Sequence, residues 1–224
     1  MTTSAPERNG LKAALAAPSK VEVTIKAPSF KTVQFKITGT APLVVHKFSQ
    51  KARHQIMQTQ MEGQKARSKK VRKAKDFDEV YKEAFHVAED GWYGVPASSF
   101  RSAMVSACRI VGYKMTLAKL ALFIEHDGFD ADEGTPLVRI HGTPRKHEAC
   151  ARNDNGSIDI RVRPMWREWT MNVRVRFDSD LLAVEDVTNL LARAGIQVGI
   201  CEGRPDSKNS TGVGWGTFSI EGGV

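Results

Sequence analysis

Residues 94–109 read GVPASSFRSAMVSACR, and this stretch decides the fold that the sequence predicts. The residue before Pro96 is expected to be extended, because the proline ring disfavours a helical conformation there. From Phe100 onward, apolar residues recur at helical spacing, and Gly112 ends the run. The stretch therefore predicts a turn that leads into a helix over residues 98–112.

The start of this helix carries two serines and an arginine. Ser98 or Ser99 can cap the helix through a hydroxyl group, and Arg101 lies in the first turn, away from the apolar stripe. Free N–H groups and the positive end of the helix dipole favour an anion at such a place. Two interpretations stay open: these three residues contact a phosphate group, or they form an ordinary helix cap beside an exposed arginine.

Strands and a second helix surround this stretch in a regular order. Apolar and polar residues alternate over 31–39 and again over 170–177, which predicts strands with one buried face. The expected core runs in the order strand 31–39, helix 98–112, strand 119–126, strand 170–177, helix 184–194, strand 215–221. This βαββαβ order is the ferredoxin-like (RRM-like) arrangement of an α+β domain.

Two insertions interrupt this core, at about 40–97 and about 127–168. The first is basic and is predicted to be partly helical. The second is predicted to be a β-hairpin, in which TPLVRIHG (135–142) pairs with SIDIRVRP (157–164) across a polar loop. Residues 1–20 are expected to be a flexible N-terminal tail, in which Pro18 ends the apolar segment LKAALAA, and residues 21–224 to form a single domain.

The composition argues against several classes of protein. No apolar run is long enough to span a membrane, and the N-terminus lacks the basic-then-apolar order of a signal peptide. The three cysteines, Cys108, Cys150 and Cys201, are widely spaced and odd in number, which favours a reducing compartment over a disulfide framework. We therefore expect a cytoplasmic protein without membrane contact.

The positive charge of the chain is concentrated in one segment. The net charge is +8, and between Lys47 and Lys75 ten basic residues stand against one acid, Glu62, which gives this segment +9. A concentrated positive field attracts polyanions, whereas a solvated surface usually mixes both signs. We expect nucleic-acid contacts here, with a solvated basic loop as the alternative. The basic residues are Lys47, Lys51, Arg53, Lys65, Arg67, Lys69, Lys70, Arg72, Lys73 and Lys75.

A long glycine-rich loop, GICEGRPDSKNSTGVGWG (199–216), precedes the last expected strand. Glycines let a main chain approach a phosphate group closely, and basic side chains supply the charge. The candidate phosphate ligands are Arg204, Lys208, Gly212 and Gly214. Glu202 and Asp206 count against a pure phosphate cradle, although they could orient Arg204. The alternative is a tight loop that only folding requires.

The segment RVRPMWREW (161–169) interleaves arginines with tryptophans. This pattern suits single-stranded nucleic acid, in which bases stack on aromatic rings and phosphates pair with arginines. Trp166 and Trp169 could instead be core residues behind the hairpin, since tryptophan is usually well buried. The candidate contacts are Arg161, Arg163, Trp166 and Arg167.

Two of these motifs resemble those of the RAMP superfamily, the RNA-binding proteins of CRISPR effector complexes. GVPASSFRSAM resembles the family's IPGSS-type helix start, and GICEGRPDSKNSTGVGWGTFSI resembles its glycine-rich loop; each lies at the expected place in the βαββαβ order. The match covers roughly half of the chain. It implies a protein similar to the backbone subunit that polymerises along a guide RNA, in the form of a compact stand-alone or virus-encoded relative.

The expected function is non-catalytic binding of single-stranded nucleic acid, RNA or DNA with RNA favoured, by copies that assemble side by side along the strand. No cofactor is expected, and no metal, because His141, His147 and Cys150 are irregularly spaced. One alternative is a metal-independent RNA endonuclease of the same superfamily, in which His46 would transfer protons. Another is a virion or scaffold protein whose basic segment neutralises nucleic acid.

Overall fold

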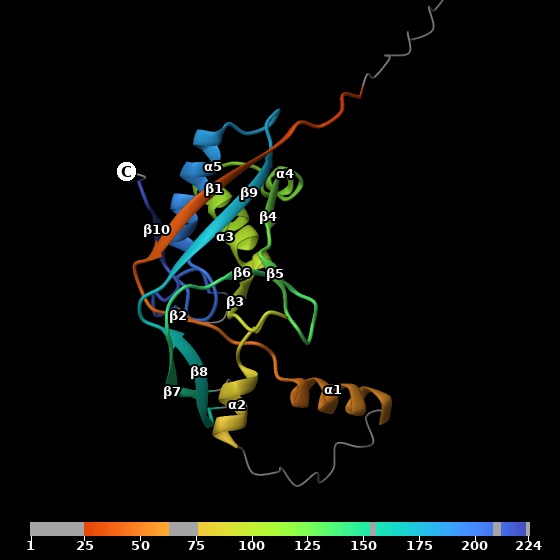
Figure 1. The fold of residues 1–224 in the computed structure, drawn as a ribbon, viewed down its shortest axis with the longest axis vertical. Coiled ribbons are helices and arrows are strands. Elements are labelled where there is room, and N and C mark those ends of the chain that lie inside the picture. Colours follow the sequence, from red (N-terminus) through yellow and green to blue (C-terminus); the bar gives the residue numbers. More distant parts are fainter. Residues whose placement is uncertain (1–24, 63–75, 153–155, 208–211, 223–224) are drawn as a thin grey trace, which may run out of the picture.

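A computed structural model describes residues 25–62, 76–152, 156–207 and 212–222. These residues form a mixed α+β structure with antiparallel sheets and five α-helices (Figure 1). None of the helices in the described ranges is long and apolar enough to cross a membrane.

The main sheet has four strands and one buried face. Its spatial order is β10 (Phe218–Ile220), β1 (Phe30–Gly39), β9 (Thr170–Asp178), β4 (Leu122–Glu125), and each neighbouring pair is antiparallel. Phe35 and Ile37 of β1 and Val173 of β9 are among the buried residues, while Lys36 and Asn172 lie between them on the other face. The alternation that predicts strands over 31–39 and 170–177 is therefore confirmed.

Helices α3 (Ala97–Val111) and α5 (Val184–Arg193) cover the buried face, and β1 and β9 cross in front of them in Figure 1. Phe100 and Met104 of α3 share one core cluster with Leu191 of α5. The sequence predicts that the second helix ends near Gly195, but a π-helical turn, η2 (Ala194–Val198), continues it. A side chain at Gly195 would overlap Phe218, so the glycine lets this helix pack closely on β10.

The expected strand over 119–126 is wrong in its first half. Helix α4 (Met115–Ala121) occupies that part, and β4 begins at Leu122. The segment LAKLALFIE is apolar at most positions, and periodicity does not separate a helix from a strand in so short a run. Ala118 and Ala121 are buried, which places one face of α4 against the core.

A β-hairpin is present in the second insertion, but its pairing differs from the prediction. Strand β8 (Ile158–Trp166) pairs with β7 (Pro144–Arg152), which lies in the expected polar loop, and also with β2 (Leu43–Val44). The segment expected to pair with β8 forms β6 (Pro136–Arg139) instead. It lies between β3 (Gly94–Pro96) and β5 (Gly128–Phe129) in a separate sheet.

The first insertion is partly helical, as predicted. It contains α1 (Gln50–Glu62) and α2 (Phe77–Glu83), and α1 extends away from the sheets in Figure 1. The hydroxyl of Ser49 accepts a hydrogen bond from the Ala52 amide at 3.2 Å, and the Asp76 carboxylate accepts two from the first turn of α2. Side-chain caps therefore fix the start of both helices.

The start of α3 differs from the sequence prediction. The helix begins at Ala97 after Pro96, and no side chain caps it, so Ser98 and Ser99 are first-turn residues and not caps. Its end is as predicted, because Gly112 adopts a left-handed conformation with φ 68°. Pro96, the residue that precedes the first turn of α3, offers no side-chain cap to the N–H groups of that turn.

Candidate nucleic-acid interface

A small cavity lies between the start of α3 and the first part of the glycine-rich loop. It has a volume of about 220 Å³. Four serines of α3 line one side of it, and loop residues that include Gly199, Cys201 and Arg204 line the other; the serines are Ser98, Ser99, Ser102 and Ser106. The structure therefore brings together two motifs that lie about a hundred residues apart in the sequence.

Side chains from α3 fasten the 199–207 loop beside this cavity. Arg109 Nη2 donates to Asp206 Oδ2 at 2.6 Å, and the pKa of Asp206 is lowered chiefly by this contact. At the other end, the Ser99 hydroxyl contacts the Cys201 thiol, whose pKa burial raises to about 12, so the thiol stays protonated. Asp206 therefore pairs with Arg109. The hydrogen bond that orients Arg204 goes to the loop backbone instead, because Arg204 donates to the Cys201 carbonyl at 3.0 Å.

Glycines let the glycine-rich loop pack against itself. A Cβ at Gly212 would overlap the Arg204 carbonyl oxygen, and a Cβ at Gly216 would overlap the carbonyl oxygen of Ile200. The tight-loop interpretation therefore accounts for these two positions. Gly214 differs, because it has φ 82° and no atom of the described residues lies within 4 Å of the position of its missing Cβ. Of the two candidate glycines, Gly214 leaves room for a ligand to approach the main chain.

Two predicted arginines meet the other side of the loop. Arg163 Nε of β8 donates to Glu202 Oε2 at 2.8 Å, and Arg161 Nη1 lies 4.0 Å from Glu202 Oε1. Glu202 is joined to β2 as well, because its amide donates to the Val44 carbonyl at 3.1 Å. Arg161 and Arg163 therefore share the Glu202 carboxylate, and Glu202 directly follows Cys201 of the cavity lining.

His46 belongs to the same group of charges. Its Nδ1 lies 3.9 Å from Glu202 Oε2, and its side chain is 42% exposed. Burial lowers the pKa of His46, Arg163 lowers it further, and Glu202 opposes them; the net direction is below the ordinary 6.5. The imidazole is therefore neutral at neutral pH and can exchange a proton close to two arginines.

Trp215 is an aromatic residue at this site that the sequence reasoning did not select. It lies in the glycine-rich loop, partly exposed, and its ring meets His147 edge to face at 5.3 Å. His147 is directly opposite Arg163 in the β7–β8 pair, so Trp215 stands beside the arginine cluster. The signal in the sequence was a tryptophan directly between two glycines of the loop.

Both tryptophans of the segment 161–169 are core residues, so the expected stacking by Trp166 is wrong. Trp166 is 1% exposed and packs edge to face on Phe85 and Tyr93. Trp169 is 2% exposed, and its Nε1 donates to the Ala41 carbonyl. Arg167, between them, is exposed. The tryptophans and arginines of this segment therefore alternate because the rings face the core and the arginines do not.

Lys47 does not face solvent, so its expected phosphate contact is wrong. It is 4% exposed, and its Nζ lies 2.7 Å from Asp130 Oδ1 and 2.7 Å from Asp132 Oδ2. The other oxygen of Asp130 contacts His86 Nδ1 at 2.9 Å. Burial raises the pKa of Asp130, but hydrogen bonds from Lys47 and His86 outweigh it, so that pKa lies below the ordinary value. Lys47 therefore ties the start of the first insertion to the start of the second.

Two further predicted arginines are engaged by the protein itself. Arg101 donates to the backbone carbonyls of Leu122 and Lys119 and lies over the ring of Phe123, so it ties α3 to α4 and β4. Arg101 is not among the residues that line the cavity, which contradicts its expected place beside Ser98 and Ser99. Arg53 of α1 pairs with Glu133 at 2.8 Å and remains partly exposed.

The remaining predicted contacts lie outside the described residues or side chains. The side chain of Lys51 is not described. The basic residues of 63–75 and the loop lysine lie outside the described ranges; they are Lys65, Arg67, Lys69, Lys70, Arg72, Lys73, Lys75 and Lys208.

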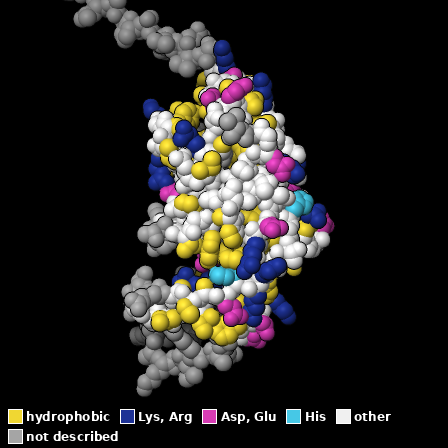
Figure 2. Space-filling view, turned by 90° about the vertical axis from the view of Figure 1, so that its left-hand side faces the viewer, with side chains coloured by type: hydrophobic (Ala, Val, Ile, Leu, Met, Phe, Trp, Pro, Cys, Tyr) yellow, Lys and Arg dark blue, Asp and Glu magenta, His cyan; other side chains and the backbone are white. Residues whose placement is uncertain are grey.

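The described surface mixes positive and negative charge. Figure 2 shows a group of Lys and Arg side chains in the lower half of one face, beside hydrophobic side chains and with acidic ones above and below it. Acids also bind several predicted cations, as Glu202 does Arg163 and Glu133 does Arg53. A phosphate group at this interface would therefore compete with carboxylates.

A comparison with models of protein families found no match to this chain. A search of curated proteins found no relative either.

Proposed function

We propose that this protein binds single-stranded nucleic acid, with RNA favoured, through the surface formed by the start of α3, the 199–207 loop and β8. The observation that carries the proposal is that two separately predicted motifs meet a third, the glycine-rich loop: α3 contacts the loop through Cys201, and β8 contacts it through Glu202. Uncapped N–H groups, serine hydroxyls and arginines are the groups that proteins use for phosphate contacts.

The architecture supports an extension of this proposal to the fold and the family. The spatial order β10-β1-β9-β4, with α3 and α5 on one face, supports the proposal of a ferredoxin-like core with insertions at about 40–97 and 127–168. The helix start and glycine-rich loop of the RAMP resemblance line the same cavity. We therefore propose a RAMP-like backbone-binding protein that holds the strand largely without reading its bases.

Binding is tested by titrating fluorescent single-stranded oligonucleotides of RNA and DNA, and a duplex, with the protein in EDTA. We expect single strands to bind more tightly than duplex and RNA more tightly than DNA. Equal affinity for all three, with little loss on adding salt, would leave only non-specific adsorption and contradict the proposal.

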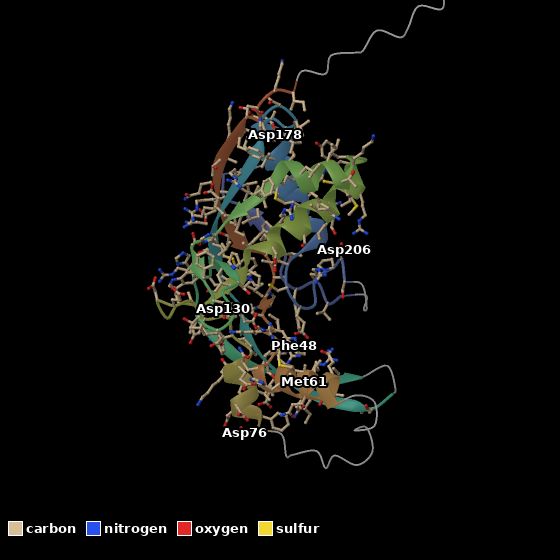
Figure 3. All side chains as sticks on the ribbon, turned by 90° about the vertical axis from the view of Figure 1, so that its right-hand side faces the viewer. Phe48, Met61, Asp76, Asp130, Asp178 and Asp206 are labelled. Atoms are coloured by element: carbon tan, nitrogen blue, oxygen red, sulfur yellow. The ribbon has the colours of Figure 1, made fainter. Side chains whose placement is uncertain are left out.

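Assembly along the strand is a further part of the proposal. Figure 3 labels Phe48, just before α1, and Met61, within α1, both lower in the view than Asp130, and both side chains are exposed. An extended helix with exposed apolar side chains offers a contact for a neighbouring copy. We expect Met61→Asp to shorten the assemblies that light scattering detects on long oligonucleotides while a short oligonucleotide binds unchanged. Ile25→Asp, at another exposed apolar position, is the matched control. A constant one-to-one complex at every length would contradict assembly.

A second function, metal-independent cleavage of RNA, is favoured by one observation. His46 has a lowered pKa and lies in the Arg161, Arg163 and Glu202 group, where a neutral imidazole could accept a proton beside cations that stabilise a phosphorane-like charge. Labelled RNA incubated in EDTA separates the two functions. Cut products that His46→Ala abolishes indicate cleavage, and intact RNA in a stable complex indicates binding alone.

A further inference from the structure

One face of the four-stranded sheet takes no part in the proposed function. It is turned away from α3 and α5, behind which those helices lie in Figure 1. Side chains alternate along a strand, so Lys36 of β1 and Arg174 and Arg176 of β9 project from this face, between buried residues such as Phe35 and Val175. Basic side chains gathered on one sheet face form a surface that nucleic acid can use.

Two phenylalanines and an arginine gather on this face near the start of β1. In the strand pairing, Arg176 of β9 lies between Thr32 of β1 and Phe123 of β4. The Cζ atom of Arg176 lies 5.5 Å from the ring centre of Phe30 and 5.2 Å from that of Phe123, and the two ring centres are 5.8 Å apart. Phe30 is 42% exposed, and Arg176 is exposed. The rings and the guanidinium group therefore pack together and still face solvent.

A hollow of about 350 Å³ lies beside this group, and its lining includes Phe123, Glu125 and Arg176. The Thr32 hydroxyl donates to Glu125 Oε1 at 3.0 Å. A carboxylate in the lining repels a phosphate group but accepts hydrogen bonds from the N–H groups of a base. The hollow and the cavity at the start of α3 have no lining residue in common, and both linings consist of described residues. The hollow therefore suits a base better than it suits a phosphate group.

Arg176 differs from the other cations of this face in its partners. Lys36 pairs with Glu221 at 2.9 Å and Arg174 with Asp127 at 3.0 Å, whereas Arg176 lies over the two rings. A guanidinium group that stacks on a ring presents a flat cationic surface, and bases stack on such surfaces as they do on aromatic rings. The charge of Arg176 thus belongs to a stacking surface, while the charges of Lys36 and Arg174 are used in ion pairs.

We propose that the ring platform, formed by Phe30, Phe123 and Arg176, stacks unpaired nucleobases of a single strand. The ligand class rests on the proposed function, and the platform adds to it a second surface that holds bases instead of phosphates. Every base has a flat π-face, so stacking is largely indifferent to sequence. The platform therefore raises the affinity for a single strand over that for a duplex, whose bases are already stacked and paired.

Titrations of the full chain with two labelled strands of equal length test the ring platform. One strand carries all its bases, and the other carries a stable abasic sugar at every position, so both have the same number of phosphates. We expect the native protein to prefer the complete strand. Phe30→Leu keeps an apolar side chain but removes the ring, and it should lower this preference about fivefold or more without changing the salt slope. Phe129→Leu is the matched control, because Phe129 is also 42% exposed but lies in β5 of another sheet.

Photocrosslinking with a strand that contains 5-iodouracil, which couples to aromatic side chains, gives a second measurement. We expect crosslinked peptides that contain Phe30 or Phe123. Crosslinks that all map outside β1 and β4 would overturn the proposal, as would an unchanged preference in a Phe30→Leu variant whose thermal melt shows that it is folded. An equal loss for both strands would give Phe30 a structural role only. If the native protein binds both strands equally well, phosphate binding stands and the platform alone is refuted; if it binds neither, the proposed function fails as well.

Discussion

Removing the two arginines beside Glu202 should weaken the salt dependence of nucleic-acid binding by a defined amount. Arg161 Nη1 and Arg163 Nε lie 4.0 Å and 2.8 Å from oxygens of the same carboxylate, and their side chains are 39% and 12% exposed. We consider the double variant Arg161→Gln/Arg163→Gln, because glutamine keeps the length and polarity of part of the side chain but loses the charge.

The expected size of the effect follows from counterion release. Each phosphate that a protein neutralises on a single strand contributes about 0.7 to the slope of log Kobs against log salt, so losing two contacts lowers the slope by about 1.4. The variant also loses the hydrogen bond of Arg163 to Glu202, which costs about 1.5–3 kcal/mol of stability for a bond to a charged group. The protein should therefore melt earlier but remain folded at room temperature.

Fluorescence anisotropy titrations of one labelled oligonucleotide, repeated over a series of salt concentrations, give the slope. Arg101→Gln is the matched control. It removes the same guanidinium group, but the native partners of Arg101 are the carbonyls of Leu122 and Lys119, so its slope should equal that of the native protein. An unchanged slope in a folded Arg161→Gln/Arg163→Gln variant would refute the placement of phosphates at this cluster, whatever the affinity.

Four other substitutions separate structural roles from binding roles. Trp166→Ala should lower the free energy of unfolding by about 3–5 kcal/mol and leave the salt slope of the folded protein unchanged. Trp215→Ala should instead weaken single-strand binding by about 1–3 kcal/mol. Thermal melts and binding titrations of each variant check both expectations. Lys47→Met should destabilise the protein by about 3–5 kcal/mol in urea unfolding, because Asp130 stays buried without its cation, and an unchanged urea midpoint would contradict that. The pKa of His46 in the folded protein lies below 6.5, so the unfolded chain takes up the proton first as the pH drops through 6.5. The melting temperature should therefore fall over this pH range, and His46→Asn should reduce that fall.

The parts of the fold that could be predicted are those with a local signal. Strict alternation marked β1 and β9, and an apolar stripe closed by glycine marked α3. The pairing of β7 with β8 could not be read in the same way, since β7 has the polar sequence PRKHEACAR and reads as a loop. The boundary between α4 and β4 could not be predicted, because a short apolar run is compatible with both a helix and a strand.

The candidate site was predictable as a set of motifs but not as an arrangement. The sequence marked the start of α3 and the glycine-rich loop as separate candidates, and only the structure shows that both line one cavity. The burial of Lys47 had no local signal, because its partner Asp130 lies 83 residues away in the sequence. Trp166 was misassigned for a related reason: a tryptophan among arginines looks the same in sequence whether its ring faces a ligand or, as on β8, the core. Exposure is a property of the assembled fold.

The two acids of the glycine-rich loop argue against a phosphate cradle in the sequence but support a binding surface in the structure. Asp206 holds the loop to α3 through Arg109, and Glu202 holds it to β8 through Arg163. The loop therefore owes its position to both carboxylates, and only Glu202 lies between two arginines that a phosphate group could use. A strand that binds here must displace Glu202 and leave Asp206 in place. Glu202→Gln should therefore tighten binding, whereas Asp206→Asn should loosen the loop and weaken it.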